Sequence, residues 1–256
     1  MTPPAPLELT VLGAGPAYTN RVGATGASYL VESGGTAVLL DLGQGSFPRL
    51  ATAIEPSRLD AVVISHLHPD HFIDLVPLRH YLAYQFSPPR RLRVLGPSGL
   101  ADRIDALHAR PGFTAEALDC EQLRGTDQRI GTLTLEARLV AHTEESYAVR
   151  LGGPTGPGLV YSGDCGVADD LAPLIRAGDT LLVEVSFGAG PVPPGALHLN
   201  AASIADLVRT TRPGRVLLTH LQMGFDPAAA IRVVAEASDA PVTLVEPGDV
   251  ITIDRT

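Results

Sequence analysis

Segments with the periodicity of strands and of helices alternate along the whole chain. Short runs that are apolar throughout, or that alternate apolar and polar residues between glycine-rich turns, predict strands. Runs with apolar residues three and four positions apart predict helices, as in the stripe formed by Leu75, Leu78, Leu82 and Phe86. Strands are expected at 7–12, 27–32, 37–41, 61–65, 92–95, 130–140, 147–151, 159–162, 215–219, 242–245 and 250–254, and helices at 47–54, 75–86, 98–109, 169–177, 200–211 and 227–237.

The order of these segments predicts two sheets in one domain. Strands followed by mixed strands and helices occur roughly twice, and no linker, low-complexity block or sharp change of composition lies between the two halves. Because each sheet must bury a face, this pattern favours two sheets with helices outside each, in a single domain over residues 1–256. Asn200 is expected to cap the helix that follows it.

Composition indicates the class of protein and the cellular compartment to expect. The chain has 256 residues, of which 45% are hydrophobic and 18% charged, and no apolar run approaches the length of a membrane span. Residues 1–6 show no signal-peptide pattern, and two cysteines are too few to frame a disulfide fold. A cytoplasmic protein without membrane attachment is therefore expected.

The charged residues exclude several function classes. The net charge is −9, and all 19 basic residues are arginine. The absence of lysine excludes a P-loop, a Schiff-base lysine and a lysine general base. An acidic chain is also a poor general binder of nucleic acid, because that binding depends on neutralising phosphates.

The segment 65–71 concentrates metal-binding side chains. His66, His68, Asp70 and His71 place three imidazoles and one carboxylate within six positions, directly after the apolar run 59–64. Imidazole together with carboxylate suits zinc, iron or manganese. In an extended start of this segment, His66 and His68 face the same side and can converge on one ion, while Asp70 and His71 can reach a second. A polar loop that is merely rich in histidine is the alternative interpretation.

Further candidate ligands follow other strand-like runs. His142 and His220 each end a predicted strand, and Asp164 follows another and could bridge two ions with its two oxygens. Each of these residues alone is a weak signal, because a histidine at a strand end is more often structural. His80 and His108 match no ligand pattern and are assigned to structure or solvent.

Taken in order, these motifs resemble the metallo-β-lactamase superfamily over nearly the whole chain. The resemblance rests on Leu40-Asp41-Leu42-Gly43, the H-x-H-x-D-H element, His142, Gly163-Asp164 and Thr219-His220. It implies an α/β (α+β) fold built as a four-layer αββα sandwich, with two divalent metal ions at the sheet edge. Zinc is the default, and manganese or iron are alternatives. One ion would be held by His66, His68 and His142, the other by Asp70, His71 and His220, with Asp164 bridging; Asp41 would brace the histidine loop or act as a structural cap.

Two later residues indicate a branch of the superfamily. The segments that contain Glu184 and His198 resemble the ribonuclease Z and cyclic-nucleotide phosphodiesterase branch, in which a glutamate orients a histidine beside the metals. That histidine helps the leaving oxygen depart, while the two ions hold a bridging hydroxide. Asp70, Glu184 and His198 are thus the expected catalytic residues, Asp70 also as a ligand. Alternatively, Glu184 is a strand-end residue and His198 lies in a surface loop.

Departures from ribonuclease Z limit the substrate. The lysine-bearing N-terminal pattern is missing, Gly163-Asp164-Cys165 replaces Gly-Asp-Thr, and no long basic arm fits between His71 and His142. These features argue against extended nucleic-acid binding. The expected function is hydrolysis of a small phosphodiester, such as a cyclic nucleotide or a short nucleic-acid end, by a chain that could form a homodimer. The alternatives are a lactonase or thioesterase of the same fold, and a non-catalytic metal-dependent ligand-binding protein.

Overall fold

The strands form two seven-stranded sheets in the described part of the chain, residues 5–125, 127–153 and 156–254 of a computed structural model. In the first sheet the order is β14 (Val250–Ile253), β1 (Leu7–Gly13), β2 (Ser28–Ser33), β3 (Thr36–Leu40), β4 (Ala61–Val63), β5 (Leu92–Gly96) and β6 (Leu118–Gln122). In the second sheet it is β13 (Val242–Leu244), β12 (Arg215–Thr219), β11 (Thr180–Glu184), β10 (Leu159–Tyr161), β9 (Tyr147–Gly152), β8 (Leu133–Leu139) and β7 (Gln128–Ile130).

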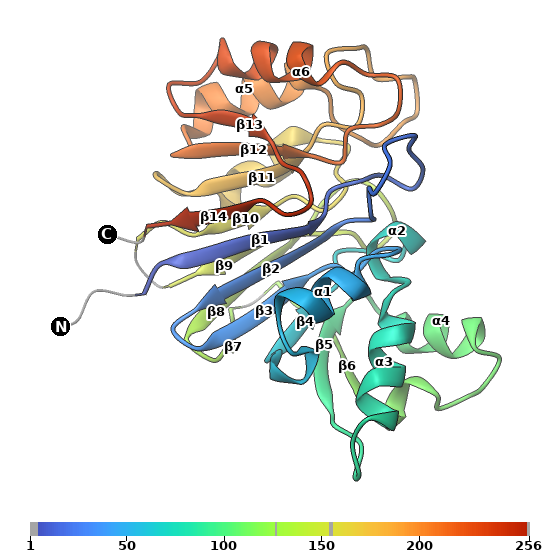
Figure 1. Ribbon diagram of the computed structural model, residues 1–256. Coiled ribbons are helices and arrows are strands. Elements are labelled where there is room, and N and C mark those ends of the chain that lie inside the picture. The colour runs from blue at the N-terminus through green and yellow to red at the C-terminus, as the bar shows by residue number, and fades with distance from the viewer. Residues whose placement is uncertain (1–4, 126, 154–155, 255–256) are drawn as a thin grey trace.

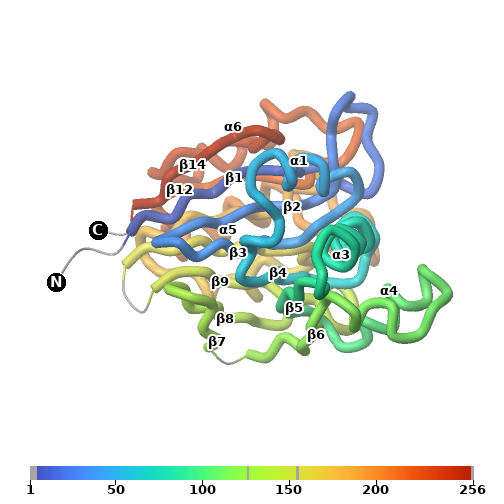
Figure 2. Tube along the Cα trace, turned by 60° about the horizontal axis from the view of Figure 1, so that its bottom comes forward, coloured from blue at the N-terminus to red at the C-terminus, as the bar shows by residue number. Residues whose placement is uncertain are grey.

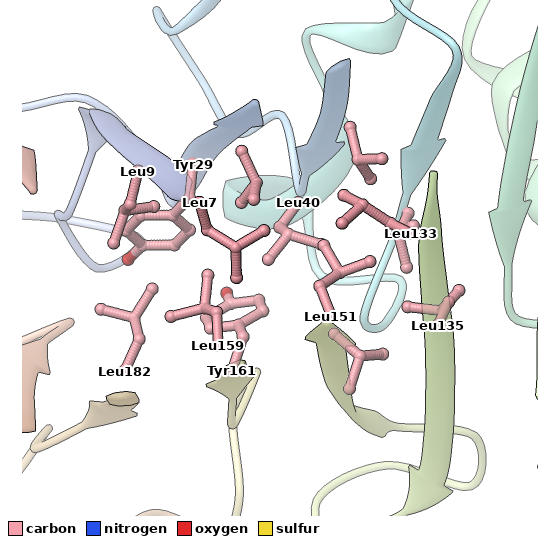
Figure 3. Close-up of a cluster of buried hydrophobic side chains, with 14 of the residues drawn as sticks. Leu7, Leu9, Tyr29, Leu40, Leu133, Leu135, Leu151, Leu159, Tyr161 and Leu182 are labelled. Atoms are coloured by element: carbon pink, nitrogen blue, oxygen red, sulfur yellow. The ribbon is translucent and has the colours of Figure 1, made fainter. Parts of the chain in front are cut away.

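Alternation along the strands builds the core between the sheets. Successive strand residues point to opposite faces, so Val38 and Leu40 of β3 belong to the inner cluster while Leu39 belongs to an outer one. In the second sheet Leu182 of β11 faces inward, and Leu181 faces outward. Figure 3 shows the facing side chains of this inner cluster. Those labelled there are Leu7, Leu9, Tyr29, Leu40, Leu133, Leu135, Leu151, Leu159, Tyr161 and Leu182.

Helices cover the outer face of each sheet (Figure 1). The first sheet packs against α1 (Phe47–Ala53), α2 (Pro69–Phe72), α3 (Leu75–Tyr84) and α4 (Leu100–Leu107). The second packs against α5 (Ala201–Thr211), α6 (Pro227–Ala235) and the 3₁₀ segment η3 (Ala168–Leu174). In the turned view of Figure 2, α3 and α4 lie near β5 and β6, and α6 lies near β12. The predicted four-layer αββα sandwich is confirmed.

No helix among the described residues has both the length and the hydrophobicity that crossing a bilayer requires. Two further 3₁₀ turns, η1 (Pro56–Arg58) and η2 (Thr114–Glu116), connect elements of the first sheet.

Two local expectations are wrong, and a third difference is a strand that was not predicted. The predicted helix at 169–177 is a 3₁₀ segment that ends at Leu174, and Pro173 within it lacks the N–H that a regular helix needs. The strand expected at 130–140 is two strands, β7 and β8, because the chain turns at Gly131 with φ +53°. Strand β6 was not predicted, since its sequence Leu-Asp-Cys-Glu-Gln is too polar to show a strand pattern.

Parallel pairing gathers the ends of several strands at one edge. Strands β3 to β6 are parallel to one another, as are β10 to β13. The carboxyl ends of parallel strands meet at the same sheet edge, which is where ligands bind in open α/β sheets. The loops after β3, β4, β10 and β12 carry Asp41, the 65–71 segment, Asp164 and His220.

The capping box of α5 gives a test of local stability. Asn200 accepts a hydrogen bond from Ser203 N–H at 3.0 Å and donates to the Gly190 carbonyl at 2.8 Å, as the expected cap. Asn200→Ala should lower the free energy of unfolding by about 1–2 kcal/mol in urea denaturation. Asn20→Ala, in an exposed loop, should change it by less than about 0.5 kcal/mol. Equal effects of both substitutions would contradict the capping role.

Candidate metal centre

The structure brings the seven predicted ligands together at the sheet edge. Their candidate ligand atoms form two groups, and within each group all the atoms lie within 4.8 Å of one another. One group contains His66, His68, His142 and Asp164, and the other contains Asp70, His71, Asp164 and His220. This division matches the two ligand sets implied by the resemblance, although ligation itself stays a prediction.

Asp164 stands between the two groups. Its Oδ2 atom lies 3.7 Å from Nε2 of His66 and 3.7 Å from Nε2 of His142. Its Oδ1 atom lies 3.3 Å from Nε2 of His71 and 3.5 Å from Nε2 of His220. Each carboxylate oxygen therefore faces a different pair of imidazoles, which is the arrangement that a bridging ligand requires.

Three buried polar atoms at this point form no hydrogen bond among the described residues, although two of them, Nε2 of His71 and Oδ1 of Asp164, lie 3.3 Å apart. Nε2 of His66, Nε2 of His71 and Oδ1 of Asp164 are buried and form no hydrogen bond with any other described residue. Leaving such groups unpaired is costly, so each one requires an explanation. All three belong to the two groups defined above and are of the nitrogen and oxygen type that zinc, iron and manganese bind. The residues present therefore fit divalent cations.

Asp41 braces the loop that carries four of these residues. Asp41 has a left-handed backbone, φ +55°, and its buried carboxylate accepts hydrogen bonds from Ser65 N–H at 2.6 Å and Ser65 Oγ at 2.7 Å. The same carboxylate lies 2.7 Å from Nδ1 of His71 and accepts a hydrogen bond from Tyr161 Oη at 2.7 Å. It thereby orients His71 with Nε2 toward Asp164.

Other imidazoles are oriented in the same way. Nδ1 of His142 lies 2.7 Å from the Leu197 carbonyl, which can only accept, so that nitrogen carries the proton. Its Nε2 is therefore unprotonated and lies 3.1 Å from Nδ1 of His68. Nδ1 of His66 lies 3.0 Å from Ser65 Oγ, whose own hydrogen is donated to Asp41. In both rings the unprotonated Nε2 is the atom that faces Asp164. A second partner of this kind is typical of metal-binding histidines.

The charges at the site favour a cation. Burial alone would raise the pKa of Asp164, but the imidazoles of His220 and His71 outweigh it and hold this pKa well below its usual value. Burial and the neighbouring His71 lower the pKa of His66 well below its usual value, so His66 is neutral and able to bind metal. Burial would also lower the pKa of His71, but Asp164 and Asp41 outweigh it and raise it. A proton on His71, or a divalent cation beside it, balances the negative charges of Asp164 and Asp41.

Glu184 and His198 form a pair beside the two groups. Glu184 ends β11 and is fully buried, and its Oε1 atom lies 2.9 Å from Nδ1 of His198. The ring of His198 is 4.7 Å from that of His142, between centroids, and its side chain is 19% exposed. Burial lowers the pKa of His198, but the hydrogen bond and charge of Glu184 outweigh it and raise this pKa. The geometry is that of an oriented imidazole open to solvent.

Ser186 joins this pair to the second group. Its Oγ atom lies 3.1 Å from Nδ1 of His220 and 3.3 Å from Nδ1 of His198, and its backbone N–H donates to Glu184 Oε2 at 3.0 Å. Sequence reasoning missed Ser186, as it missed Ser65 and Tyr161. For Ser186 a signal existed, because residues two apart in an extended segment share a face, and Ser186 follows Glu184 by two.

The expectation for His80 and His108 agrees with the structure. His80 and His108 lie away from the site, against Phe113, on which His108 stacks with centroids 3.8 Å apart. Arg91 and Arg93 pair with Asp119 and Glu121 on the neighbouring strand, so they belong to the sheet surface.

The comparisons with known proteins agree with this geometry. The family described as "Beta-lactamase superfamily domain" matches residues 36–221, a range that includes every candidate ligand. The chain belongs to this superfamily. One relative is described as the probable metallo-hydrolase YhfI of Bacillus subtilis, and this description connects the fold with metal-dependent hydrolysis. That protein is 26% identical to this chain, over 84% of the chain and 87% of its own length.

Other relatives and solved structures extend the likeness over nearly the full length. The Mycobacterium tuberculosis protein Rv1339 is 31% identical over 92% of this chain and 88% of its own. The crystal structure of YhfI superposes with a TM-score of 0.85, at 22% identity, covering 96% of this chain and 99% of that one. Human tRNase Z, short form, superposes with a TM-score of 0.75 at 21% identity, covering 96% of this chain and 99% of that one. A diphosphatase of the PhnP family superposes with a TM-score of 0.75 at 16% identity, covering 97% of this chain and 98% of that one.

Asp164→Asn tests the proposed bridging position. The substitution keeps the size of the side chain but removes the negative charge between the imidazoles. We expect less than half the wild-type divalent metal per chain by elemental analysis. We also expect the thermal stabilisation by added zinc to be lost, which for wild type at 100 times Kd is about 2.7 kcal/mol. Asp239→Asn, at an exposed turn, is the control. Unchanged metal content in Asp164→Asn would contradict the bridging position.

Ser186→Ala tests the contact with His220. Loss of the hydroxyl leaves Nδ1 of His220 without this partner, so affinity for an ion held by Asp70, His71 and His220 should fall about 10–100-fold in a metal titration. Ser186→Thr should restore it. Ser162→Ala is a matched control, because Ser162 is equally buried but its hydroxyl contacts only the backbone of Glu184 and Gly163. Equal metal affinities in the two alanine variants would show that Ser186 has no such role.

Proposed function

We propose that this chain is a dinuclear metal-dependent phosphodiesterase that hydrolyses a small phosphodiester, such as a cyclic nucleotide or a short nucleic-acid end. The observation that carries the proposal is the Glu184–His198 pair at 2.9 Å beside the two candidate metal groups. An alkoxide that leaves from phosphorus at neutral pH gains from a positioned acid, and this pair could supply one. His198, with Nδ1 held by Glu184, keeps its other ring nitrogen for that proton.

The bound ions would supply Lewis acidity and an activated water for the attack. The chain's own residues would then perform the remaining tasks. His66, His68 and His142 would hold one ion, and Asp70, His71 and His220 the other; Asp164 would contact both. Glu184 would orient His198 and stabilise its protonated form. Asp70 is assigned to catalysis only through its place beside His220, where its Oδ2 lies 3.2 Å from Nε2.

Two further observations support phosphorus chemistry and a small substrate. Two of the solved structures with this fold are described as a tRNase Z and as a diphosphatase, both of which cleave bonds to phosphorus. Between His71 and His142, the described residues form α3, β5, α4 and β6 to β8, without a long protruding arm. With a net charge of −9, this favours a small substrate over an extended nucleic acid. Zinc is the proposed metal, by the chemistry of a histidine-rich site.

His198→Ala tests the role of the pair through the leaving group. Hydrolysis of a cyclic nucleotide, whose alkoxide needs a proton, should slow about 10²- to 10⁴-fold. Hydrolysis of bis(p-nitrophenyl) phosphate should slow less than about tenfold, because p-nitrophenolate leaves without a proton. The measurement is kcat for both substrates at equal metal content. His108→Ala, an imidazole outside the site, should match wild type.

The outcome also separates the rival functions. If kcat fell equally for both substrates, His198 would not be the residue that gives a proton to the leaving group. Lactone or thioester hydrolysis by wild type, without turnover of either phosphodiester, would replace the proposal with a carbonyl-ester hydrolase. Metal binding without hydrolysis of any ester would indicate a binding protein.

A further inference from the structure

A cavity of about 530 Å³ opens beside His68. Its walls come from the loops after β4, β5 and β8, and His68 is part of the lining. His68 is exposed, whereas its neighbours His66 and His71 are buried. A group that fills this cavity therefore lies against the exposed side of the candidate metal centre. Its volume is within the range of small-molecule sites, about 300–1,000 Å³.

The walls of this cavity are held by hydrogen bonds within the protein. Glu145 accepts hydrogen bonds from Ser98 N–H and from Gln122 Nε2, the latter at 3.1 Å, and so joins two of the three loops. Thr143 contacts Ser146 Oγ through its N–H at 3.1 Å and its hydroxyl at 2.7 Å. The shape of the cavity is thus set before any ligand enters, which reduces the ordering cost of binding.

Two opposite charges in the cavity are unpaired. The side chains of Arg103, on α4, and Glu144 are exposed and form no hydrogen bond or ion pair with any other described residue. Arg91 and Arg93, at the start of β5, are in contrast both paired with carboxylates. A ligand that satisfies both Arg103 and Glu144 must present acceptors and donors together.

We propose that this cavity binds the purine base of a nucleotide whose phosphate lies at the metal centre. A purine has flat apolar faces for Leu67 and Pro69, which also line the cavity. Its edge carries acceptors, such as N7 and O6 of guanine, that match the arginine, and amino or ring N–H donors that match the glutamate. The inference rests on the proposed phosphodiesterase function and specifies its substrate as a purine nucleotide.

The experiment compares a substrate that has a base with one that lacks it. KM and kcat are measured for cyclic GMP and for bis(p-nitrophenyl) phosphate with metal-loaded wild type, Arg103→Ala and Glu144→Gln. Arg232→Ala and Glu236→Gln, exposed side chains on or next to α6 without partners among the described residues, are matched controls. For cyclic GMP, KM should rise about tenfold in each cavity variant, with kcat changed less than about twofold. For the base-free substrate neither parameter should change.

Each outcome decides one of the two proposals. If wild type hydrolyses both substrates and the cavity variants behave as the controls do, the base site is wrong and the phosphodiesterase stands. If wild type hydrolyses neither, the phosphodiesterase fails, and the cavity is tested by binding alone. An NMR titration of the full-length protein with GMP then supports the cavity if both cavity variants weaken binding about tenfold, and overturns it if GMP does not bind or the variants bind as wild type does.

Discussion

The buried carboxylate of Asp41 is the contact on which the rest of the site depends. It receives hydrogen bonds from the loop after β4 through Ser65, and it also contacts His71. Its fourth contact is with Tyr161, which belongs to β10 of the opposite sheet. One carboxylate thus fixes the histidine loop and ties it to the second sheet. Without these partners the buried charge would be very costly, so the fold and the site stabilise each other.

A second set of contacts across the sheets keeps the two halves of the site in register. Tyr29 of β2 is hydrogen-bonded to Thr219 of β12 at 2.6 Å, and the N–H of His220 donates to the Ala14 carbonyl at 3.0 Å. His220, with φ +58°, is held in a left-handed backbone that costs free energy in a non-glycine residue. Its position is therefore determined by the surrounding structure rather than by local preference.

The two functional parts of the site share one hydroxyl. Ser186 contacts His198 of the proposed acid pair and His220 of the second metal group. Displacement of either imidazole therefore affects the other through a buried contact about 3 Å long. On the far side of His142 the centre opens at His68, toward the cavity that contains Arg103 and Glu144. His142 thus contacts His198 on the side of the acid pair and His68 on the side of the cavity.

Sequence alone determined the layers of this protein and pointed to its candidate metal ligands. The dense spacing of histidine and aspartate pointed to His66, His68, Asp70 and His71, because such spacing is a local signal. The order of strand and helix segments along the chain predicted two sheets. Strand β6 was not predicted because its sequence is too polar. The turn at Gly131 and the 3₁₀ segment that contains Pro173 were also not predicted. Only the tertiary structure decided that each oxygen of Asp164 faces a different imidazole pair, that Tyr161 bonds Asp41, and that Ser186 joins His198 to His220. These contacts join residues from different strands, and their distances depend on how the two sheets pack, which no local pattern encodes.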